Sequence, residues 1–395
     1  MINVAIVGTG NISSAHVQGY QQFPERCRIV ALCDVVPEKA ARLAKDHGLG
    51  PVEVLPSVEE ICRRTGVDLV SVCTPPSTHA DITVALLEAG IDVLLEKPMA
   101  PSVAECDRIL AAQGRSGKTL SVVAQNRFRD DLATLRAAVD SGLMGPITHV
   151  RMDSAWWRGL PYYDLSWRGT WESEGGGPTL NHAIHHIDLL LWLLGAPKSV
   201  TAMMTNAAHE NAEGEDLSVA LLEYERAVAQ LTSSVVHHGE DQEIVVQGRN
   251  ASVAQPWSVK AEASQPNGFP ARGGDSDLVR RLEDVAAAHP PLAHHGHTGQ
   301  IDDVLSALEE STLPVVTGED GRRAVEVVPA IYQAAIERRN VPVPIPEDSP
   351  YYRLDGLLGN APRFFAKTRS VDDLGGTITV GASSNAADPK EEGTR

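Results

Sequence analysis

Lys97 is the residue of this sequence whose position most clearly suggests chemistry. It stands in the segment Glu96–Pro98, directly after the apolar run Val93–Leu95. The chain opens with an apolar segment that ends in the glycine turn Gly8–Gly10. A lysine at the carboxyl end of a strand, in a sheet that starts with such a turn, faces the crevice where nucleotides bind. We therefore expect Lys97 to contact both cofactor and substrate and to handle a proton.

A second group of candidate catalytic residues follows three glycines. Asn181, His185 and Asp188 come shortly after Gly175–Gly177, and in one predicted helix their offsets of four and seven place them on one face. The pKa of an imidazole lies near working pH, so His185 could be the general acid or base for a hydroxyl group. The amide of Asn181 could orient that hydroxyl. The glycines are expected to let the backbone pass close to a ligand.

The histidines His182, His185 and His186 have two other interpretations. They could bind a metal ion, but no cysteine and no nearby pair of carboxylates completes a ligand set, so we expect no metal. They could also serve only in capping or core packing. Their role therefore depends on what the fold places beside them.

Four tryptophans precede the glycines: Trp156, Trp157, Trp167 and Trp171. Their faces could stack on the ring of a ligand, or they could fill the core or a domain interface. Of these, Trp167 with its neighbour Arg168 is our candidate for cofactor contact, and Trp157 for substrate contact.

The glycine turn predicts dinucleotide binding. Gly8 would make the tight turn, and Gly10 would let the backbone approach a pyrophosphate, which then rests on the helix N-terminus. Asn11 and Ile12 continue into that helix. Ser13 replaces the third glycine of the pattern, but it is small enough for close packing of helix and strand.

Asp34 ends the second predicted strand, 24 residues after Gly10. A carboxylate there can accept hydrogen bonds from both ribose hydroxyls and would repel a 2′-phosphate. No arginine follows it directly, so we expect NAD in preference to NADP. The alternative is a solvated loop aspartate.

A rigid loop follows the next buried strand. Thr74, Pro75 and Pro76 lie at the expected carboxyl edge of the sheet, where ligands bind, and His79 comes three residues later. We expect these residues to contact the cofactor. His79 could equally be a first-turn helix residue without a ligand.

Two domains must position these residues. Residues 1–124 alternate strands and helices, which predicts a doubly wound parallel sheet. Residues 125–345 begin with a helix at Phe128–Asp140 and then read mostly as strands, which predicts an α+β domain with a large, mostly antiparallel sheet. Within it, Leu217–Tyr224 and Ala227–Val236 read as a hairpin. Two late helices, Gly299–Glu310 and Gly318–Arg338, could pack on either domain.

Three other stretches are less regular. Residues 262–290 are rich in proline, glycine and charge and suggest a long loop. Ser57 and the two glutamates after it read as a capping box at a short helix. Residues 346–381 form a C-terminal extension without an assigned role, for which one hypothesis is an arm on a neighbouring subunit. Residues 382–395 are small and polar, and we expect them to be disordered.

Composition excludes several partners. The 395 residues include 34 basic and 52 acidic side chains, a net charge of −18. Nucleic acids and anionic membranes need a basic footprint, so neither is expected. The five cysteines have no metal or disulfide spacing and fit a reducing cytoplasm. No leader or membrane-spanning apolar stretch is expected from the sequence.

With these motifs in order, the chain resembles the Gfo/Idh/MocA oxidoreductases, the group of glucose–fructose oxidoreductase and inositol dehydrogenases. The segments Gln125–Arg127, Trp167–Gly169 and His297–Gln300 also resemble the family, and the similarity spans about residues 2–345. It implies a Rossmann domain followed by a domain whose open sheet carries the substrate and often the oligomer contact. It also implies hydride transfer between nicotinamide and a sugar or cyclitol carbon. The expected partners are a small sugar or polyol and further copies of the chain, as a dimer or tetramer.

The resemblance also implies roles for single residues. Lys97 becomes the central lysine, bridging cofactor and reacting hydroxyl, and His185 the acid or base. Asn181 occupies a position where many inositol-type members have aspartate; asparagine cannot accept a proton, so a relay through this position would be compromised. Asn126 is expected at both cofactor and substrate. His297, in a group with His294 and His295, is expected near the substrate, with solvated loop residues as the alternative.

Two rival functions stay open. Some relatives retain NAD and use transient oxidation to cleave a glycosidic bond, and nothing in the sequence excludes this. A non-enzymatic, cofactor-sensing regulator is the second rival. Lys97 and His185 argue against it, because a pure binding protein needs neither.

Overall fold

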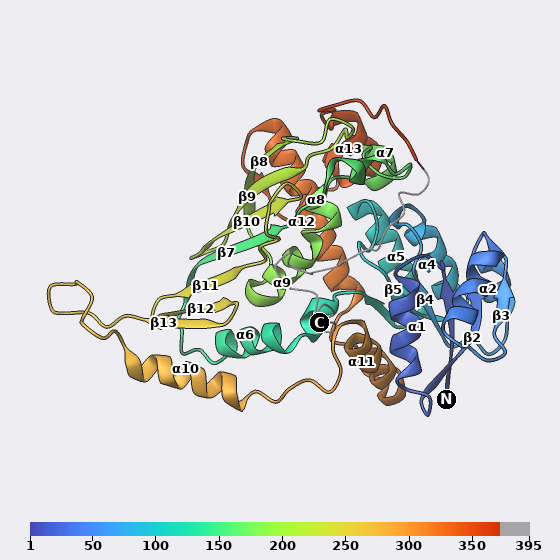
Figure 1. The fold of residues 1–395 in the computed structure, drawn as a ribbon, viewed down its shortest axis with the longest axis horizontal. Coiled ribbons are helices and arrows are strands. Elements are labelled where there is room, and N and C mark those ends of the chain that lie inside the picture. Colours follow the sequence, from blue (N-terminus) through green and yellow to red (C-terminus); the bar gives the residue numbers. More distant parts are fainter. Residues whose placement is uncertain (372–395) are drawn as a thin grey trace, which may run out of the picture.

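The computed structural model describes residues 1–371, which form two units side by side, each built on one sheet (Figure 1). The first unit has a six-stranded parallel sheet in the order β3-β2-β1-β4-β5-β6. Its strands are β1 (Ile2–Val7), β2 (Cys27–Cys33), β3 (Glu53–Leu55), β4 (Leu69–Val72), β5 (Asp92–Leu95) and β6 (Leu120–Val122). This order is that of a Rossmann fold and confirms the predicted doubly wound sheet.

Helices cover both faces of this sheet. They are α1 (Ser13–Gln21), α2 (Pro37–Asp46), α3 (Val58–Arg63), α4 (His79–Glu88) and α5 (Val103–Ser116). Strands β4 and β5 are buried along their whole length, which explains why their sequences are mostly apolar and do not alternate with polar residues. Two details were wrong or missed: Ser57 makes no capping hydrogen bond at α3, and the three-residue strand β3 was too short to give a sequence pattern.

The second unit has an eight-stranded sheet in the order β13-β12-β11-β7-β10-β9-β8-β14. Its strands are β7 (Ile147–Ala155), β8 (Ser199–Thr205), β9 (Leu217–Glu223), β10 (Val228–Ser234), β11 (Ile244–Gly248), β12 (Ala251–Gln255), β13 (Ser258–Ala261) and β14 (Val341–Pro342). Every neighbouring pair is antiparallel except β7 and β10. The predicted mostly antiparallel sheet and the β9–β10 hairpin are therefore confirmed.

The helices of the second unit are α6 (Asp130–Asp140), α7 (Trp171–Glu174), α8 (Pro178–Asn181), α9 (Ile184–Leu194) and α10 (Ser276–Ala288). The expectation of one long loop over residues 262–290 was wrong, because α10 occupies its second half. Asp275 caps this helix, and its inner face buries only Leu278 and Leu282. Two buried apolar positions one turn apart give only a weak helical pattern. The proline, glycine and charged residues of the stretch therefore outweighed it in the sequence prediction.

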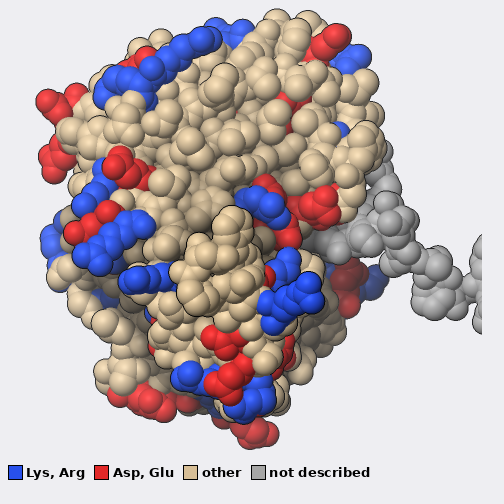
Figure 2. All heavy atoms as spheres, turned by 90° about the vertical axis from the view of Figure 1, so that its left-hand side faces the viewer, with Lys and Arg blue, Asp and Glu red and all other residues tan. Residues whose placement is uncertain are grey.

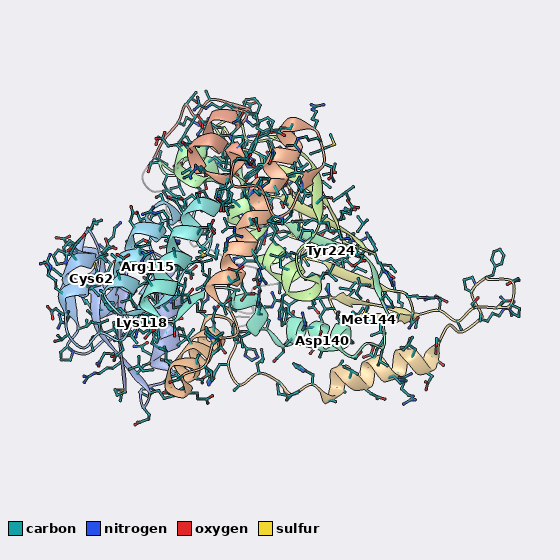
Figure 3. The ribbon with its side chains drawn as sticks, turned by 180° about the vertical axis from the view of Figure 1, so that it is seen from behind. Cys62, Arg115, Lys118, Asp140, Met144 and Tyr224 are labelled. Atoms are coloured by element: carbon teal, nitrogen blue, oxygen red, sulfur yellow. The ribbon has the colours of Figure 1, made fainter. Side chains whose placement is uncertain are left out.

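The two late helices differ in where they pack. Helix α11 (Gly296–Glu310) lies against α1 of the first unit, whereas α12 (Gly318–Glu337) contacts both α5 and the pair β8 and α9. Seen from behind, α12 stands between the units (Figure 3). It therefore ties the two sheets together across the region where the candidate site lies.

The C-terminal extension packs on its own chain as far as it is described, and an arm on a neighbouring subunit stays a hypothesis. Tyr351 and Tyr352, in the short 3-10 helix η4 (Pro350–Tyr352), are buried in the core of the second unit. Helix α13 (Leu354–Asn360) follows them. The predicted disordered tail, residues 382–395, lies outside the described residues. Among residues 1–371, no helix is both long and apolar enough to cross a membrane.

Candidate active site

The glycine turn after β1 has the conformation that a dinucleotide needs. Gly8 has φ +86°, and a Cβ there would lie 2.8 Å from the backbone of Cys73, so only glycine fits. A Cβ on Gly10 would meet nothing within 4 Å, which leaves open space over the turn. The backbone N–H groups of Asn11 and Ile12 have no partner within the described chain. These free donors at the start of α1 fit a pyrophosphate.

Asp34 follows β2 and holds this turn in place. One carboxylate oxygen accepts hydrogen bonds from the backbone and the hydroxyl of Thr9 (2.8 and 2.7 Å), and the other from Val36 N–H (2.9 Å). Burial alone would raise the pKa of Asp34, but these hydrogen bonds outweigh it and lower the pKa. The carboxylate is therefore charged, and its place at the end of β2 is where an adenosine ribose would be bound.

The Thr74 loop lies at the same edge, but His79 is not available to a ligand. Its side chain is buried, with one ring nitrogen 2.9 Å from the carbonyl oxygen of Pro98 and the other 2.8 Å from that of Thr74. Burial lowers its pKa. His79 thus ties the Thr74–Pro76 loop to the segment after Lys97, which is a positioning role.

Glu96 lies between two histidines that are far apart in the sequence. Its Oε1 is 3.0 Å from His16 Nε2 and 3.2 Å from His297 Nε2, while Oε2 accepts from the backbone N–H of Lys97 (3.1 Å). Burial would raise the pKa of Glu96, but the two histidines hold it well below its usual range. His297, expected near the substrate, therefore contacts Glu96.

His16 was missed by the sequence reasoning, although a histidine on the inner face of α1 was a usable signal. Together with Glu96 and His297 it is a group with ligand atoms within 4.8 Å of one another, close enough to hold a metal ion. The two N···O distances are also those of ordinary hydrogen bonds, and His16 Nδ1 is satisfied by Ser71 Oγ at 3.0 Å. We interpret the group as a hydrogen-bonded anchor for Lys97.

Lys97 and His185 line the same small pocket, together with Ala124 and Ile184. Burial lowers the pKa of Lys97, which Arg168 lowers further and Glu96 raises. Burial also holds the pKa of His185 well below its usual range, with Lys97 adding to the effect. His185 is therefore neutral at pH 7 and can accept a proton, next to an ammonium group that can donate a hydrogen bond.

The expected single helix carrying Asn181, His185 and Asp188 is wrong. The chain forms α8, turns at His182 and Ala183, and restarts as α9, because the backbone N–H groups of both turn residues bond to the Pro178 carbonyl. The amide of Asn181 donates to Gly176 O (2.8 Å) and Gly177 O (3.3 Å). Its oxygen is the atom left for a substrate hydroxyl.

Asp188 is committed to an ion pair. Arg127 donates to its two oxygens at 2.9 and 2.7 Å, and both side chains are buried. The pair joins α9 to the 3-10 helix η2 (Gln125–Phe128), which follows β6 and carries the half-buried Asn126. Asp188 thus positions its neighbours and is not free for proton transfer.

The three glycines approach protein groups, not an open ligand space, which corrects the expectation from sequence. A Cβ on Gly176 would collide with the Tyr332 hydroxyl, and one on Gly177 with Glu215. Glu215 accepts from Gly177 N–H (3.1 Å), Thr179 N–H (3.2 Å) and Tyr332 O–H (2.9 Å). Burial raises the pKa of Glu215 to about 6. This buried carboxyl holds the start of α8.

The tryptophans do not form one cluster. Trp171 is core and packs edge-on against Tyr332. Trp167 is half exposed, with the Arg168 guanidinium 3.8 Å from its ring centroid. Trp157 is also half exposed and stacks on His238. Of these three tryptophans, only Trp167 and Trp157 are open to a ligand.

The guanidinium of Arg168 is held from two further sides. It lies 4.2 Å from the ring centroid of Tyr162 and pairs with Glu174 at 2.8 Å. The other two histidines of the late group lie apart from Glu96: His295 pairs with Asp130 and His294 packs on Phe23. Neither is placed to bind substrate.

Comparison with known proteins agrees with this geometry. Residues 2–124 match the model of an oxidoreductase family with an NAD-binding Rossmann fold, and residues 132–254 match the Gfo/Idh/MocA C-terminal domain. Inositol 2-dehydrogenase of Rhizobium meliloti (strain 1021) is 25% identical over 348 residues, which cover 87% of this chain and 99% of that protein. D-glucoside 3-dehydrogenase of Escherichia coli (strain K12) is 30% identical over 203 residues, 51% of this chain and 57% of that protein.

A solved structure is similar over the same length. The WlbA dehydrogenase from Bordetella pertussis, in complex with NADH and UDP-GlcNAcA, matches with a TM-score of 0.73 and 27% identity, covering 87% of this chain and 99% of that one. The Rossmann sheet of the first unit thus agrees with the family model that matches it. The chain is a member of the Gfo/Idh/MocA family, an NAD(P)-dependent oxidoreductase of the sugar and cyclitol dehydrogenase type.

Proposed function

We propose that this protein is an NAD-dependent dehydrogenase that transfers hydride between nicotinamide and a secondary hydroxyl or ketone of a sugar, a sugar derivative or an inositol. The observation that carries the proposal is that Lys97 and His185 line one pocket. In that pocket His185 is kept neutral by burial and by the nearby ammonium group. The nucleotide would supply the hydride acceptor when bound.

The protein's own groups handle the proton. His185 accepts the proton of the substrate hydroxyl as the C–H bond breaks. The Lys97 ammonium donates a hydrogen bond to the same oxygen and stabilises its developing negative charge. The free amide oxygen of Asn181 accepts a hydrogen bond from a neighbouring hydroxyl and so orients the ring.

The proposed cofactor contacts line the carboxyl edge of the first sheet. Gly10, Asn11 and Ile12 would bind the pyrophosphate, and Asp34 the ribose, which favours NAD over NADP. The remaining proposed contacts are Gly8, Thr74, Pro75, Pro76, Glu96, Asn126, Trp167 and Arg168. Trp157 and His297 are proposed near the substrate. Residues 1–124 would then form the cofactor-binding domain and residues 125–345 the domain that supplies most substrate contacts.

The test is NADH absorbance with the purified protein over aldoses, inositols, anhydrosugars, glycosides and sugar acids, with NAD and NADP in parallel. A signal with one polyol class and NAD supports the proposal. No NADH absorbance with any compound, together with nucleotide released on denaturation, would contradict the proposal and favour an NAD-retaining glycosidase.

We also propose that the second sheet forms the contact of a homo-oligomer. Four apolar side chains point outward from β8, β9 and β10: Met203, Val219, Leu221 and Val228. Figure 2 shows that this side of the molecule has a broad area with few charged groups. Leu221→Glu should lower the mass measured by light scattering, whereas Leu313→Glu, at another exposed leucine, should not. Equal masses for both variants and the unaltered chain would contradict this contact.

The five cysteines are all unpaired, and four of them are buried. Cys62 is the half-buried one and lies on the outer part of the first unit (Figure 3). Unpaired thiols support our proposal of a reducing cytoplasm as the location.

A further inference from the structure

The segment that carries Trp167 and Arg168 has little regular structure of its own. It runs from β7 to α7 and contains only the 3-10 helix η3 (Leu160–Asp164). Side chains in such a segment keep their positions only if other parts of the chain hold the backbone. Gly169 is held from inside, because its N–H donates to Glu174 (2.6 Å) and its carbonyl accepts from Glu213 N–H (2.7 Å).

Residues 362–371, which we call the C-terminal strap, hold the same segment from outside. The Lys367 ammonium donates to the backbone carbonyls of Tyr163 (2.7 Å) and Leu165 (2.9 Å). Val371 pairs with Leu165 like a parallel strand, with hydrogen bonds of 2.8 Å to Asp164 and Ser166. The strap thus fixes the backbone immediately before Trp167.

The strap also contacts the segment on the far side of Arg168. The indole N–H of Trp171 donates to the carbonyl of Pro362 at 2.8 Å. Trp171 is buried in the core of the second unit, so this contact ties the strap to a rigid point. In Figure 1 the chain after α13 runs beside α7. Trp167 and Arg168 therefore lie between two points of attachment.

A buried asparagine joins the two layers. Asn211 Oδ1 accepts from Thr368 N–H (2.7 Å) and Arg369 N–H (3.0 Å). Its amide donates to the Tyr163 carbonyl (3.1 Å) and to Asp164 (2.8 Å). One side chain thus uses its whole hydrogen-bonding capacity to join strap and segment, which makes their relative position specific.

We propose that the C-terminal strap positions the segment that carries Trp167 and Arg168, with Lys367 as its main positioning residue. The proposal rests on the proposed function, in which that segment contacts the cofactor. Removal of the strap lets the segment move, and the cofactor loses contacts held in a fixed geometry.

Two truncations test the strap in the otherwise intact chain. A chain that ends at Ala361 lacks the strap but keeps α13, and a chain that ends at Val371 keeps the strap and is the matched control. We expect the shorter chain to have a KM for NAD raised about tenfold, the scale on which one hydrogen bond to a charged group contributes to binding. The control should match the full chain. An unchanged KM in a folded shorter chain would overturn the proposal.

Point variants separate positioning from mere stability. Lys367→Ala should raise the KM for NAD with a smaller change in kcat, and should speed hydrogen exchange of the Ser166 and Arg168 amides about tenfold. Lys367→Arg should restore both, because a guanidinium can reach the same carbonyls. Ser370→Ala, an exposed strap residue whose side chain makes no hydrogen bond to the described residues, is the control and should change neither.

The outcomes are distinguishable from a failure of the proposed function. If the full chain binds no NADH, the proposed function fails, and the exchange rates still test whether the strap holds the segment. If exchange rises in Lys367→Ala but the KM for NAD does not, the strap braces the fold without shaping the site, and the inference is overturned. Equal exchange in all variants overturns it as well.

Discussion

The cofactor half and the substrate half of this site are built in different ways. In the cofactor half, the glycine turn, Asp34 and Lys97 directly follow β1, β2 and β5, three strands of one parallel sheet. Carboxyl ends of parallel strands meet at one edge, so each residue reaches the site through its own strand. In the substrate half, Asn181 and His185 lie on two short helices whose positions depend on distant side chains.

The helices of the substrate half are held by buried pairs from distant parts of the chain. Tyr332 binds Glu215 across 117 residues, and Arg127 binds Asp188 across 61. Both pairs are buried, so a change in either partner leaves an unsatisfied polar group in the core. The difference teaches that the glycine turn and Asp34, which sit on strand ends, should tolerate remote changes. The substrate half, and the segment with Trp167 and Arg168, should respond to residues that touch no ligand.

The largest effect should come from Lys97→Ala. It removes the ammonium that would contact the reacting oxygen, and turnover should fall about 10³-fold, as when a preorganised donor is lost. The NADH dissociation constant should change far less, because the glycine turn is untouched. Single-turnover kinetics and NADH fluorescence measure the two quantities. Near-normal turnover would remove the lysine from the mechanism.

His185→Gln should lower kcat about 10²–10⁴-fold, the range of a general base. The pH profile is the sharper measurement. Since burial holds the pKa of His185 well below 6.5, kcat/KM of the unaltered chain should stay level as the pH falls from 7 to 6.5 and decline only at lower pH. A decline of kcat/KM centred at the ordinary histidine pKa would contradict the buried environment of His185.

A change at Glu215 tests whether this carboxyl group holds the start of α8 in the substrate half. Burial raises the folded-state pKa of Glu215 to about 6, above the ordinary 4.5 of a glutamate, so the fold favours the protonated acid. The contribution of this group to the free energy of unfolding is therefore fully present below pH 4.5 and is lost as the pH rises through 6. The cost at pH 7 is about 2 kcal/mol. Glu215→Gln should flatten this part of a plot of unfolding free energy against pH; an unchanged slope would show that another group titrates.

The smallest effect should come from Asp34→Ala in the cofactor half. We expect the KM for NAD to rise about tenfold and the preference over NADP to narrow, because one charged hydrogen-bond acceptor contributes on this scale. The matched comparison is Val35→Ala, whose exposed side chain is directly beside it. An unchanged ratio of the two kcat/KM values would mean that Asp34 only holds Thr9.

The success of the sequence predictions follows the same division. All strands of the first sheet except β3, together with the glycine turn and the lysine segment, were predicted because short-range patterns produce them. The break between α8 and α9, helix α10 and the contact of His16 with Glu96 were not. Each depends on a partner that lies far away in the sequence, or on a helix with few buried positions.

The sequence by itself determined the Rossmann unit, the hairpin of the second sheet and the identity of Lys97 and His185 as candidates, because periodicity and strand ends are local properties. Only the tertiary structure decided that these two residues share a pocket and that the glycines make room for Tyr332 and Glu215. It also decided that the C-terminal strap binds the segment before Trp167. Burial, which sets the pKa values of the site, arises when distant segments exclude water together, and no single stretch of sequence contains it.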